Sequence, residues 1–273
     1  MAGVQFYRDA DLPFFELKLC DADRLCYKKH SHEEYSLGVV ETGSSSFWYE
    51  GKTTRVNPQT VVLIPPGLVH SCNPQSYGQW KYKMLFIEAG WMQRFFASKG
   101  LPALCQPVVT GQANFQSYTA LRSMLERLIK PISPLEKEAG IIGFFEEQAV
   151  RGMALWKKCS RAKELPKLKI IKEYLDNNYL RRITLEELEQ VSDLNKFTII
   201  RSFKDEFSIP PHTYQTLLRV NCAKKLLRQN NQITEVAYKT GFYDQSHFHK
   251  VFKSHTGVTP DKYKSCEESQ FID

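Results

Sequence analysis

"NKFTIIRSFKDEFSIPPHTY", residues 195–214, aligns without gaps with "DQSHFHKVFKSHTGVTPDKY", residues 244–263, so the C-terminal part of the chain contains one pattern twice. In both copies a Phe-Lys pair, a proline and a tyrosine occupy matching positions. A repeat at fixed spacing indicates a duplicated structural unit. The structure predicted for one copy of this unit therefore applies to both copies.

Each copy predicts a helix with one buried face. Asn195 and Asp244 stand at the first position of their copies, and both residue types are favoured helix N-caps. Behind each cap, large apolar residues stand four apart, while the other positions are mostly polar or basic. The positions predicted to be buried are Ile199, Phe203, Phe248 and Phe252.

A second helix is predicted before each of these helices. In "ITLEELEQVSDL", residues 183–194, Thr184 and Glu187 have the spacing of a capping box. In "ITEVAYKTGF", residues 233–242, Gly241 suits the positive φ found at helix C-termini. Two helices joined by a short turn form a helix-turn-helix motif, which we predict at about 183–204 and again at about 233–253.

A connecting helix is predicted between the two motifs, in "PHTYQTLLRVNCAKKLLRQ", residues 211–229. A helix of this length spans ~28 Å at ~1.5 Å per residue. Successive major-groove segments on one face of DNA lie ~34 Å apart. A stiff connector of this length can therefore hold two recognition helices in adjacent turns of the major groove.

These elements closely resemble the DNA-binding domain of AraC/XylS-type bacterial transcription regulators. The resemblance covers roughly the last hundred residues, and the Gly-Phe, Gln-Ser-His-Phe, Phe-Lys and Gly-Val-Thr-Pro elements follow the order of that family. By position, the resemblance implies base contacts from Phe197, Ile200, Arg201, Gln245, Ser246, His249 and Lys250. We expect phosphate contacts from Lys196, Lys204 and Lys253.

Helical geometry independently places residues 245, 246, 249 and 250 on the face opposite Phe248 and Phe252. Arg201 has the donors for a guanine edge, and Gln245 can pair with adenine. In the family that the sequence resembles, the position of Ile200 often carries a polar residue; isoleucine cannot form that hydrogen bond, and contact with a thymine methyl group is the alternative. A single basic amphipathic helix commonly has no partner other than solvent. Two copies in the order and spacing of one family favour DNA binding over that interpretation.

The first hundred residues predict a small all-β unit, either a sandwich or a barrel. "SLGVVETGSSSFWYEGKTTRV", residues 36–56, alternates strand-like runs with turn residues. From about Asn114 the apolar spacing becomes helical, and a helical pair is predicted. Its apolar positions are Phe115, Tyr118, Leu121, Leu125 and Leu128, then Leu135, Ala139, Ile142, Ala149, Met153 and Trp156. The basic stretch "KKCSRAKELPK", residues 157–167, is predicted to be a linker.

Two histidine-containing stretches in the β-unit are candidates for a binding site. "KKHSHEEY" and "LIPPGLVHSCNP" place His30, His32 and His70 on strands whose side chains can converge, and they resemble the two motifs of the cupin barrel. Metal-binding cupins add a glutamate where Ser36 or Leu37 stands here. We rank an effector cavity first, a metal site second and purely structural histidines third. The cavity candidates are His30, His32, Glu34, Trp48, His70 and Tyr82; for Trp48 and Tyr82 strand packing is favoured.

Composition agrees with an ordinary globular protein of two domains. The chain has 273 residues, 42% of them hydrophobic and 25% charged, and a net charge of +7, a weak indication of a polyanionic partner. Seven scattered cysteines without Cys-x-x-Cys spacing favour reduced thiols over a zinc site or disulfides. There is no apolar run near 18 residues and no signal-peptide pattern, so a cytoplasmic location is expected.

The fold class predicted from these observations is α+β and multidomain. We expect a cupin-like all-β effector-binding domain at 1–110, a helical dimerisation segment at 111–160, and a DNA-binding domain with two helix-turn-helix motifs at 161–268. The predicted function is sequence-specific regulation of transcription, as an activator controlled by a small-molecule effector, with no enzymatic activity and no cofactor. Double-stranded DNA, an effector, a second copy of the chain and, by resemblance, RNA polymerase are the expected partners. The alternatives are a metal-dependent cupin enzyme carrying a DNA-binding appendage, and a constitutive activator without an effector.

Overall fold

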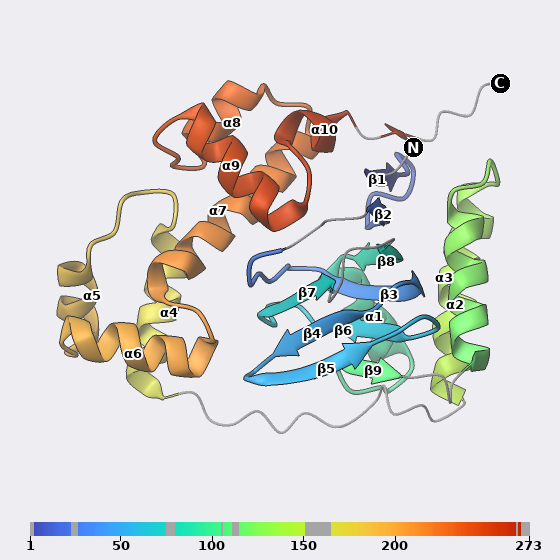
Figure 1. The fold of residues 1–273 in the computed structure, drawn as a ribbon, viewed down its shortest axis with the longest axis horizontal. Helices are drawn as coiled ribbons and strands as arrows, with labels where there is room; N and C mark the ends of the chain where they lie inside the picture. The colour runs from blue at the N-terminus through green and yellow to red at the C-terminus, as the bar shows by residue number, and fades with distance from the viewer. Residues whose placement is uncertain are drawn as a thin grey trace.

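The N-terminal part of the protein is built from β-strands, and the C-terminal part from helices (Figure 1). The computed structural model describes residues 3–22, 27–74, 80–104, 106–110, 115–150, 165–265 and 267–268. Within these residues, no helix is long and apolar enough to cross a membrane.

Two sheets form the N-terminal domain, and β10 from the C-terminal end of the chain adds an edge strand to the larger one. The larger has the order β10-β1-β2-β8-β3-β6-β9, and the smaller has the order β5-β4-β7. The strands are β1 (Gly3–Arg8), β2 (Phe15–Ala22), β3 (Tyr35–Thr42), β4 (Ser45–Tyr49), β5 (Lys52–Val56), β6 (Val61–Ile64), β7 (His70–Pro74), β8 (Trp80–Ile87), β9 (Val108–Thr110) and β10 (Glu267–Glu268). The all-β domain predicted from the sequence is confirmed as a β-rich one, while its closure into a barrel stays a prediction.

One helix that the sequence analysis did not predict lies within this domain. Helix α1 (Ala89–Ser98) follows β8 and buries Trp91, Met92, Phe95 and Phe96. These residues recur at steps of three and four, so they form one apolar stripe of the helix. The domain is therefore β-rich and not purely β.

The helical pair α2 (Phe115–Leu128) and α3 (Pro134–Val150) is confirmed, but only part of the predicted apolar face of α3 is correct: Ile142 packs against the core, and two other predicted positions are exposed. Leu135 is 78% exposed and Ala139 is also exposed. The buried face of α3 consists of Lys137, Ile141, Phe144, Phe145 and Gln148. Lys137 lies on the buried face because its Nζ donates to Asp9 Oδ2 at 2.6 Å and Tyr7 Oη at 2.7 Å. The apolar spacing alone therefore did not indicate the buried face of α3, because a charged residue with a buried partner occupies one of its positions. Residues 153 and 156 of the prediction lie outside the described residues.

The C-terminal helices contain both predicted helix-turn-helix motifs. They are α4 (Pro166–Asn178), α5 (Leu185–Ser192), α6 (Lys196–Phe207), α7 (Pro211–Arg228), α8 (Ile233–Lys239), α9 (Gln245–Thr256) and α10 (Pro260–Lys264). We call α4–α6 the first DNA-binding unit and α8–α10 the second; α7 joins them. The predicted core positions are confirmed, because Ile199, Phe203, Phe248 and Phe252 have no exposed area.

The predicted helix ends are confirmed by their hydrogen bonds. The amide of Thr198 donates to Asn195 Oδ1 at 2.9 Å, and the amide of His247 donates to Asp244 Oδ1 at 2.7 Å. Thr184 and Glu187 form the capping box. Gly241 has φ +76° just after α8, and the Cβ of any other residue there would lie 2.3 Å from the carbonyl oxygen of Leu180.

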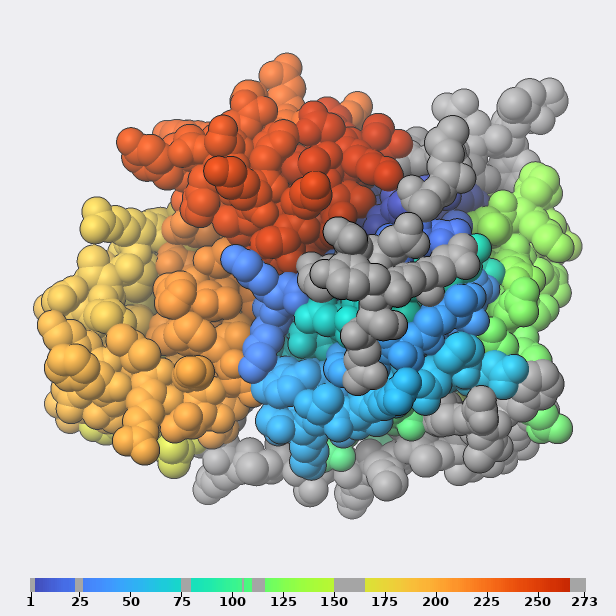
Figure 2. Space-filling view, in the orientation of Figure 1, coloured from blue at the N-terminus to red at the C-terminus, as the bar shows by residue number. Residues whose placement is uncertain are grey.

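The second DNA-binding unit packs directly on the N-terminal sheet, and Figure 2 shows its red surface against blue N-terminal residues. One hydrophobic cluster contains Val4 and Phe6 of β1 together with Phe248 and Phe252 of α9. At Gly257, an added Cβ would lie 2.8 Å from the hydroxyl of Tyr27. We call this contact between the N-terminal domain and helices α7–α10 the interdomain seam.

Candidate DNA-binding surface and interdomain cavity

The first recognition helix, α6, presents its predicted DNA-facing residues to solvent. Phe197 is 75% exposed and Ile200 is 40% exposed, although both are apolar. The side chain of Arg201 is 87% exposed, and its Nε lies 3.9 Å from Asp205 Oδ2. Because Ile199 and Phe203 fix the opposite face in the core, these three side chains are held outward. Lys196 and Lys204 are exposed on the same helix.

The second recognition helix, α9, exposes four of its five predicted DNA-facing residues: Gln245, Ser246, Lys250 and Lys253. The fifth, His249, is half-buried, and its Nδ1 lies 3.8 Å from Asp261 Oδ2 of α10. The Nε2 atom of His249 is buried without a hydrogen-bond partner. The structure therefore places His249 at the edge of the surface that the other four residues form.

The other two histidines of the repeat have different surroundings. His247 is exposed and meets the ring of Phe242 edge-on, with ring centroids 5.7 Å apart. His255, at the end of α9, is buried in the interdomain seam, where its Nδ1 bonds to the carbonyl oxygen of Val251 at 2.8 Å. His255 therefore lies away from the exposed residues listed above for α9, whereas His247 is a neighbour of Lys250, three residues before it on the helix.

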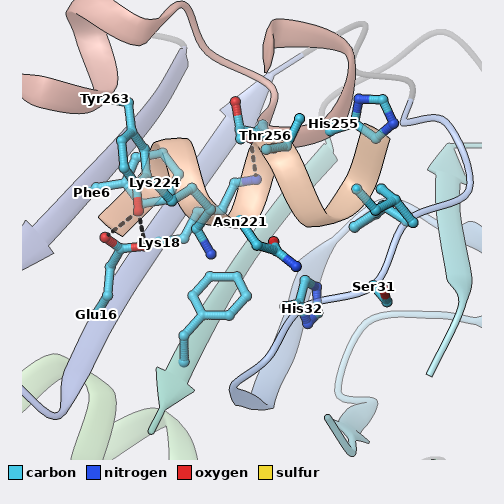
Figure 3. Close-up of a pocket in the computed structure, with 14 residues that line it drawn as sticks. Phe6, Glu16, Lys18, Ser31, His32, Asn221, Lys224, His255, Thr256 and Tyr263 are labelled. Atoms are coloured by element: carbon cyan, nitrogen blue, oxygen red, sulfur yellow. Dashed lines mark hydrogen bonds between the residues drawn. The ribbon is translucent and has the colours of Figure 1, made fainter. Parts of the chain in front are cut away.

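A cavity lies in the interdomain seam, between β1, β2 and β8 on one side and α7 with the end of α9 on the other (Figure 3). It has room for about 50 Å³ of solvent. Of the predicted effector-binding residues, only His30 and His32 line it. The remaining lining residues include Glu16 and Lys18 of β2, Asn221 and Lys224 of α7, and Tyr263 of α10.

Glu34, Trp48 and Tyr82 do not line the cavity and have other partners. Glu34 Oε1 accepts from Lys224 Nζ at 3.2 Å, and so helps to close the seam. Trp48 packs beside the ammonium of Lys29, which lies 3.2 Å from the ring centroid. Tyr82 bonds to the hydroxyl of Tyr27 at 2.9 Å. Trp48 and Tyr82 are thus in packed positions, the arrangement that the sequence analysis favoured for them.

A buried carboxylate holds the two sides of the seam together. Glu16 is 2% exposed, and its Oε2 accepts from Arg8 Nε at 2.7 Å. From the other side, Arg228 Nη2 lies 3.1 Å from Glu16 Oε1, and the hydroxyl of Tyr263 donates to Glu16 Oε2 at 2.9 Å. Burial alone would raise the pKa of Glu16, but Arg228 and Arg8 outweigh it and lower the pKa to about 2. Glu16 is therefore ionised at neutral pH.

A buried lysine lies beside this carboxylate in the cavity. The Nζ of Lys18 donates to the carbonyl oxygen of Thr256 at 2.8 Å, a bond that crosses the seam (Figure 3). It also bonds to the hydroxyl of Tyr27 at 2.9 Å. Burial lowers the pKa of Lys18 to about 8. The cavity thus contains a cation and an anion on one strand, both of which bond to the C-terminal helices.

The three histidines of the N-terminal domain come together as the sequence analysis expected. The backbones of His30 and His70 form an isolated antiparallel bridge, with both N–O distances 2.9 Å. The ring centroids of His30 and His70 lie 4.5 Å apart, and those of His32 and His70 lie 4.7 Å apart. Burial lowers the pKa of all three rings, that of His70 to about 4, so they are neutral near pH 7.

Sequence reasoning missed most of the cavity, because its residues come from segments more than 200 positions apart. One signal was present in "FELKLC" of β2, where Glu16 and Lys18 alternate with apolar residues in a strand. Charges at alternate positions point to one face of a sheet. A charged stripe on a strand that is otherwise apolar indicates partners from another part of the chain.

Comparison with known proteins agrees with this two-part architecture. The family model of the helix-turn-helix domain matches residues 188–265, and that of the AraC-like ligand binding domain matches residues 18–145. An uncharacterised helix-turn-helix transcriptional regulator of Bacillus subtilis, YbfI, is 27% identical over 225 residues, which are 81% of each chain. The transcriptional activator RhaS of Yersinia pestis is 24% identical over 257 residues, 89% of this chain and 91% of its own.

A solved structure shows the same fold over nearly the whole chain. Apo ToxT from Vibrio cholerae, in a variant form, has a TM-score of 0.63 at 14% identity and covers 92% of this chain and 97% of its own. The fold, the paired motifs and these matches define a DNA-binding transcription regulator with a ligand-binding domain. The chain belongs to the AraC family of helix-turn-helix transcriptional regulators.

Proposed function

We propose that the protein activates transcription and that a small-molecule effector controls it from the interdomain seam. The single observation that carries effector control is that Glu16 of the N-terminal domain holds both the connecting helix α7, through Arg228, and the second DNA-binding unit, through Tyr263, next to a cavity. Activation is proposed because RhaS, which matches most of the chain, is a transcriptional activator. We assign no catalytic reaction to the chain.

The DNA contacts are proposed from the exposed side chains of α6 and α9. Arg201 has the donors for two hydrogen bonds to guanine, and Gln245 for a pair with adenine. The exposed apolar side chains Phe197 and Ile200 suit the methyl groups of thymine. Ser246, His249 and Lys250 complete the base-facing set, and Lys196, Lys204 and Lys253 are assigned to phosphates.

The double variant Arg201→Ala/Lys250→Ala tests this surface in a DNA-binding assay with the chain's own upstream DNA. Loss of a two-bond guanine contact costs ~1–3 kcal/mol, so specific affinity should fall by roughly 10-fold or more. Lys52→Ala/Arg55→Ala removes the same charge from an exposed strand and should leave affinity unchanged. Unchanged specific binding in the first variant would show that α6 and α9 do not contact the operator as proposed.

The size of the cavity sets how an effector can act. Sites for small organic ligands typically enclose ~300–1,000 Å³, whereas this cavity holds about 50 Å³. An effector of ordinary size must therefore displace α7 and α10 from the sheet to enter. It would then shift the equilibrium between a closed and an open seam, in proportion to its preference for the open form.

A metabolite panel in a thermal-shift assay tests effector control. A compound that stabilises the full chain should also change its affinity for operator DNA, because binding and opening are coupled. The variant Lys18→Met removes a cation from the cavity and should abolish the response to an acidic compound. If no compound stabilises the protein while it binds DNA and activates transcription, the protein is a constitutive activator.

Dimerisation through α2 and α3 is the remaining part of the proposal. These helices lie on the side of the sheets away from α4–α6 (Figure 1). The pair exposes apolar side chains: Leu135 of α3 is 78% exposed, and Ile129, directly after α2, is 40% exposed. Leu135→Glu should therefore shift the protein toward monomer in light-scattering measurements. A dimer with unchanged dissociation constant would place the interface elsewhere.

We further propose that the N-terminal sheets form the predicted cupin-like barrel and that RNA polymerase is the partner in activation. The domain bounds 1–110, 111–160 and 161–268 are kept as part of this proposal, and they are consistent with the element order, in which α2 and α3 follow the strands and α4 begins at Pro166. Expression of residues 161–273 alone tests the last boundary, because an independent domain should unfold cooperatively.

A further inference from the structure

We propose that His30, His32 and His70 bind one divalent zinc ion through their Nε2 atoms, with the remaining coordination position open to water or to a donor atom of a bound ligand. One ligand nitrogen from each ring lies within 4.8 Å of the other two. Nitrogen atoms bound to one tetrahedral zinc at ~2.1 Å are about 3.4 Å apart. The rings therefore need to close by no more than about 1.4 Å in any pair to hold the ion.

The hydrogen bonds of the rings fix which nitrogen is free to bind. His30 Nδ1 lies 2.8 Å from the carbonyl oxygen of Lys28, and His70 Nδ1 lies 2.9 Å from that of Leu68. A carbonyl oxygen can only accept, so both Nδ1 atoms carry hydrogen, and the lone pair of each neutral ring is on Nε2. His32 Nδ1 bonds to the hydroxyl of Ser36 at 2.9 Å. Bonds of this kind orient the histidine ligands of metal sites.

The backbone holds the three rings in place before an ion arrives. His30 and His70 are paired across the backbone bridge, so their side chains point to the same face. The carbonyl oxygen of His32 accepts from the amide of Gly67 at 2.8 Å, which ties the two histidine-containing segments together a second time. A preformed set of ligands lowers the cost of binding, because little chain has to be ordered.

The alternative, three histidines packed for stability alone, leaves a cost unexplained. With their hydrogens on Nδ1, His30 and His70 each have only a lone pair on Nε2 and cannot donate to one another through these atoms. His32 could donate to at most one of them at a time, so at least one lone pair receives no hydrogen from the other two rings. The donor set favours zinc over calcium or magnesium, because imidazole suits zinc while the latter two prefer oxygen ligands. Three imidazoles with an open position are also the ligand set of zinc sites that retain a water.

The site lies at the edge of the interdomain seam, because His30 and His32 also line the cavity. His255 of α9 lines the same cavity, is 8% exposed, and has a buried Nε2 without a hydrogen-bond partner. A water or ligand atom on the zinc could supply the hydrogen that this atom lacks. The ion would then be linked to the second DNA-binding unit as well as to the sheet.

Metal binding by the untagged full chain tests the proposal, with cobalt as the absorbing substitute for zinc. After removal of bound metal, the protein should take up one zinc per chain, with an increase in melting temperature. His30→Gln and His70→Gln should each weaken uptake by at least ~100-fold, and Ser36→Ala by ~10-fold, since it removes only the orienting bond. His212→Ala removes an exposed histidine of α7 and should bind metal like the wild type.

Circular dichroism of the metal-free variants shows whether they fold. If the buried substitution His70→Gln prevents folding, His30→Gln, at a partly exposed position, still tests the site. The cobalt complex should lack thiolate charge-transfer bands, because no cysteine is among the ligands. The proposal is overturned if the wild type takes up no metal at 100 μM (the concentration of the assay), if the folded variants bind metal like the wild type, or if thiolate bands appear. These readouts do not depend on DNA binding, so they separate this proposal from the proposed function.

Discussion

Replacing Glu16 by glutamine removes the charge that holds the interdomain seam, with little change of shape. In the wild type this carboxylate accepts from Arg228 and Tyr263 of the C-terminal helices and from Arg8 of its own domain. Glutamine keeps one oxygen acceptor but leaves Arg228 with Glu34 as its remaining carboxylate, 3.4 Å away. In the closed seam the buried guanidinium of Arg228 would then face one carboxylate in place of two, and this loss of opposite charge disfavours the closed form.

The structure gives the order of magnitude of the effect. The pKa of Glu16 is about 2, compared with ~4.3 for an unperturbed glutamate, a difference of roughly 2 units. At 1.36 kcal/mol per unit, the ionised form is stabilised by about 3 kcal/mol. Part of this comes from Arg8, which belongs to the same domain, so we expect the seam to lose about 2 kcal/mol. The ratio of closed to open protein should then fall by roughly 10- to 100-fold.

Hydrogen–deuterium exchange and DNA binding measure the result. Glu16→Gln should speed amide exchange at the C-terminal half of α7, and it should raise DNA affinity in the absence of effector if the closed seam restrains the second DNA-binding unit. Glu50→Gln, at an exposed turn, is the matched control. A double-mutant cycle with Arg228→Met should give a coupling of at least ~1 kcal/mol. No change in exchange and no coupling would refute the reasoning; lower DNA affinity would show that the closed form is the one that binds DNA.

Three further predictions concern stability. Because the folded pKa of Glu16 is depressed, the stability that this residue contributes to the seam is complete above about pH 5 and is lost as pH falls toward 2. Acid should therefore open the seam in the wild type, and less so in Glu16→Gln, as measured by hydrogen–deuterium exchange. Phe252→Ala should cost ~3–5 kcal/mol in urea unfolding, whereas Phe197→Ala, at an exposed position, should cost under ~0.5 kcal/mol; equal costs would contradict the assigned faces. Asp244→Ala should cost ~1 kcal/mol through the lost cap, and a neutral result would mean that water replaces the cap.

The recognition helices could be predicted because local rules fix them. Asn195 and Asp244 cap their helices through side-chain bonds to residues three positions on, and this spacing is visible in the sequence. The exposed and buried faces then follow from the 3.6-residue period, and the second copy of the pattern confirms each assignment independently. Short-range chemistry therefore determined both the element and its orientation.

The interdomain cavity could not be predicted, because long-range pairing of charges creates it. Glu16 and Arg228 are 212 residues apart, and neither sequence neighbourhood indicates the other. Lys137 shows the same limit on α3: a lysine occupies a core position that the apolar spacing did not predict, because its partner Asp9 lies on a distant segment. Buried charges contradict hydrophobic periodicity wherever their partners come from elsewhere in the fold.

Helix α7 determines what an effector in the seam is able to move. Arg219, near its middle, donates to the carbonyl oxygens of Tyr179 at 2.7 Å and Gly241 at 2.6 Å, and so ties the end of α4 and the turn after α8 to one helix. Arg228, at its C-terminal end, is the residue that the N-terminal domain holds. Opening the seam therefore displaces the two DNA-binding units together and leaves the spacing of their recognition helices unchanged. It follows that an effector would change where the two DNA-binding units lie relative to the N-terminal domain. In a dimer this would change the distance between the two half-sites, while the sequence read within each half-site stays the same.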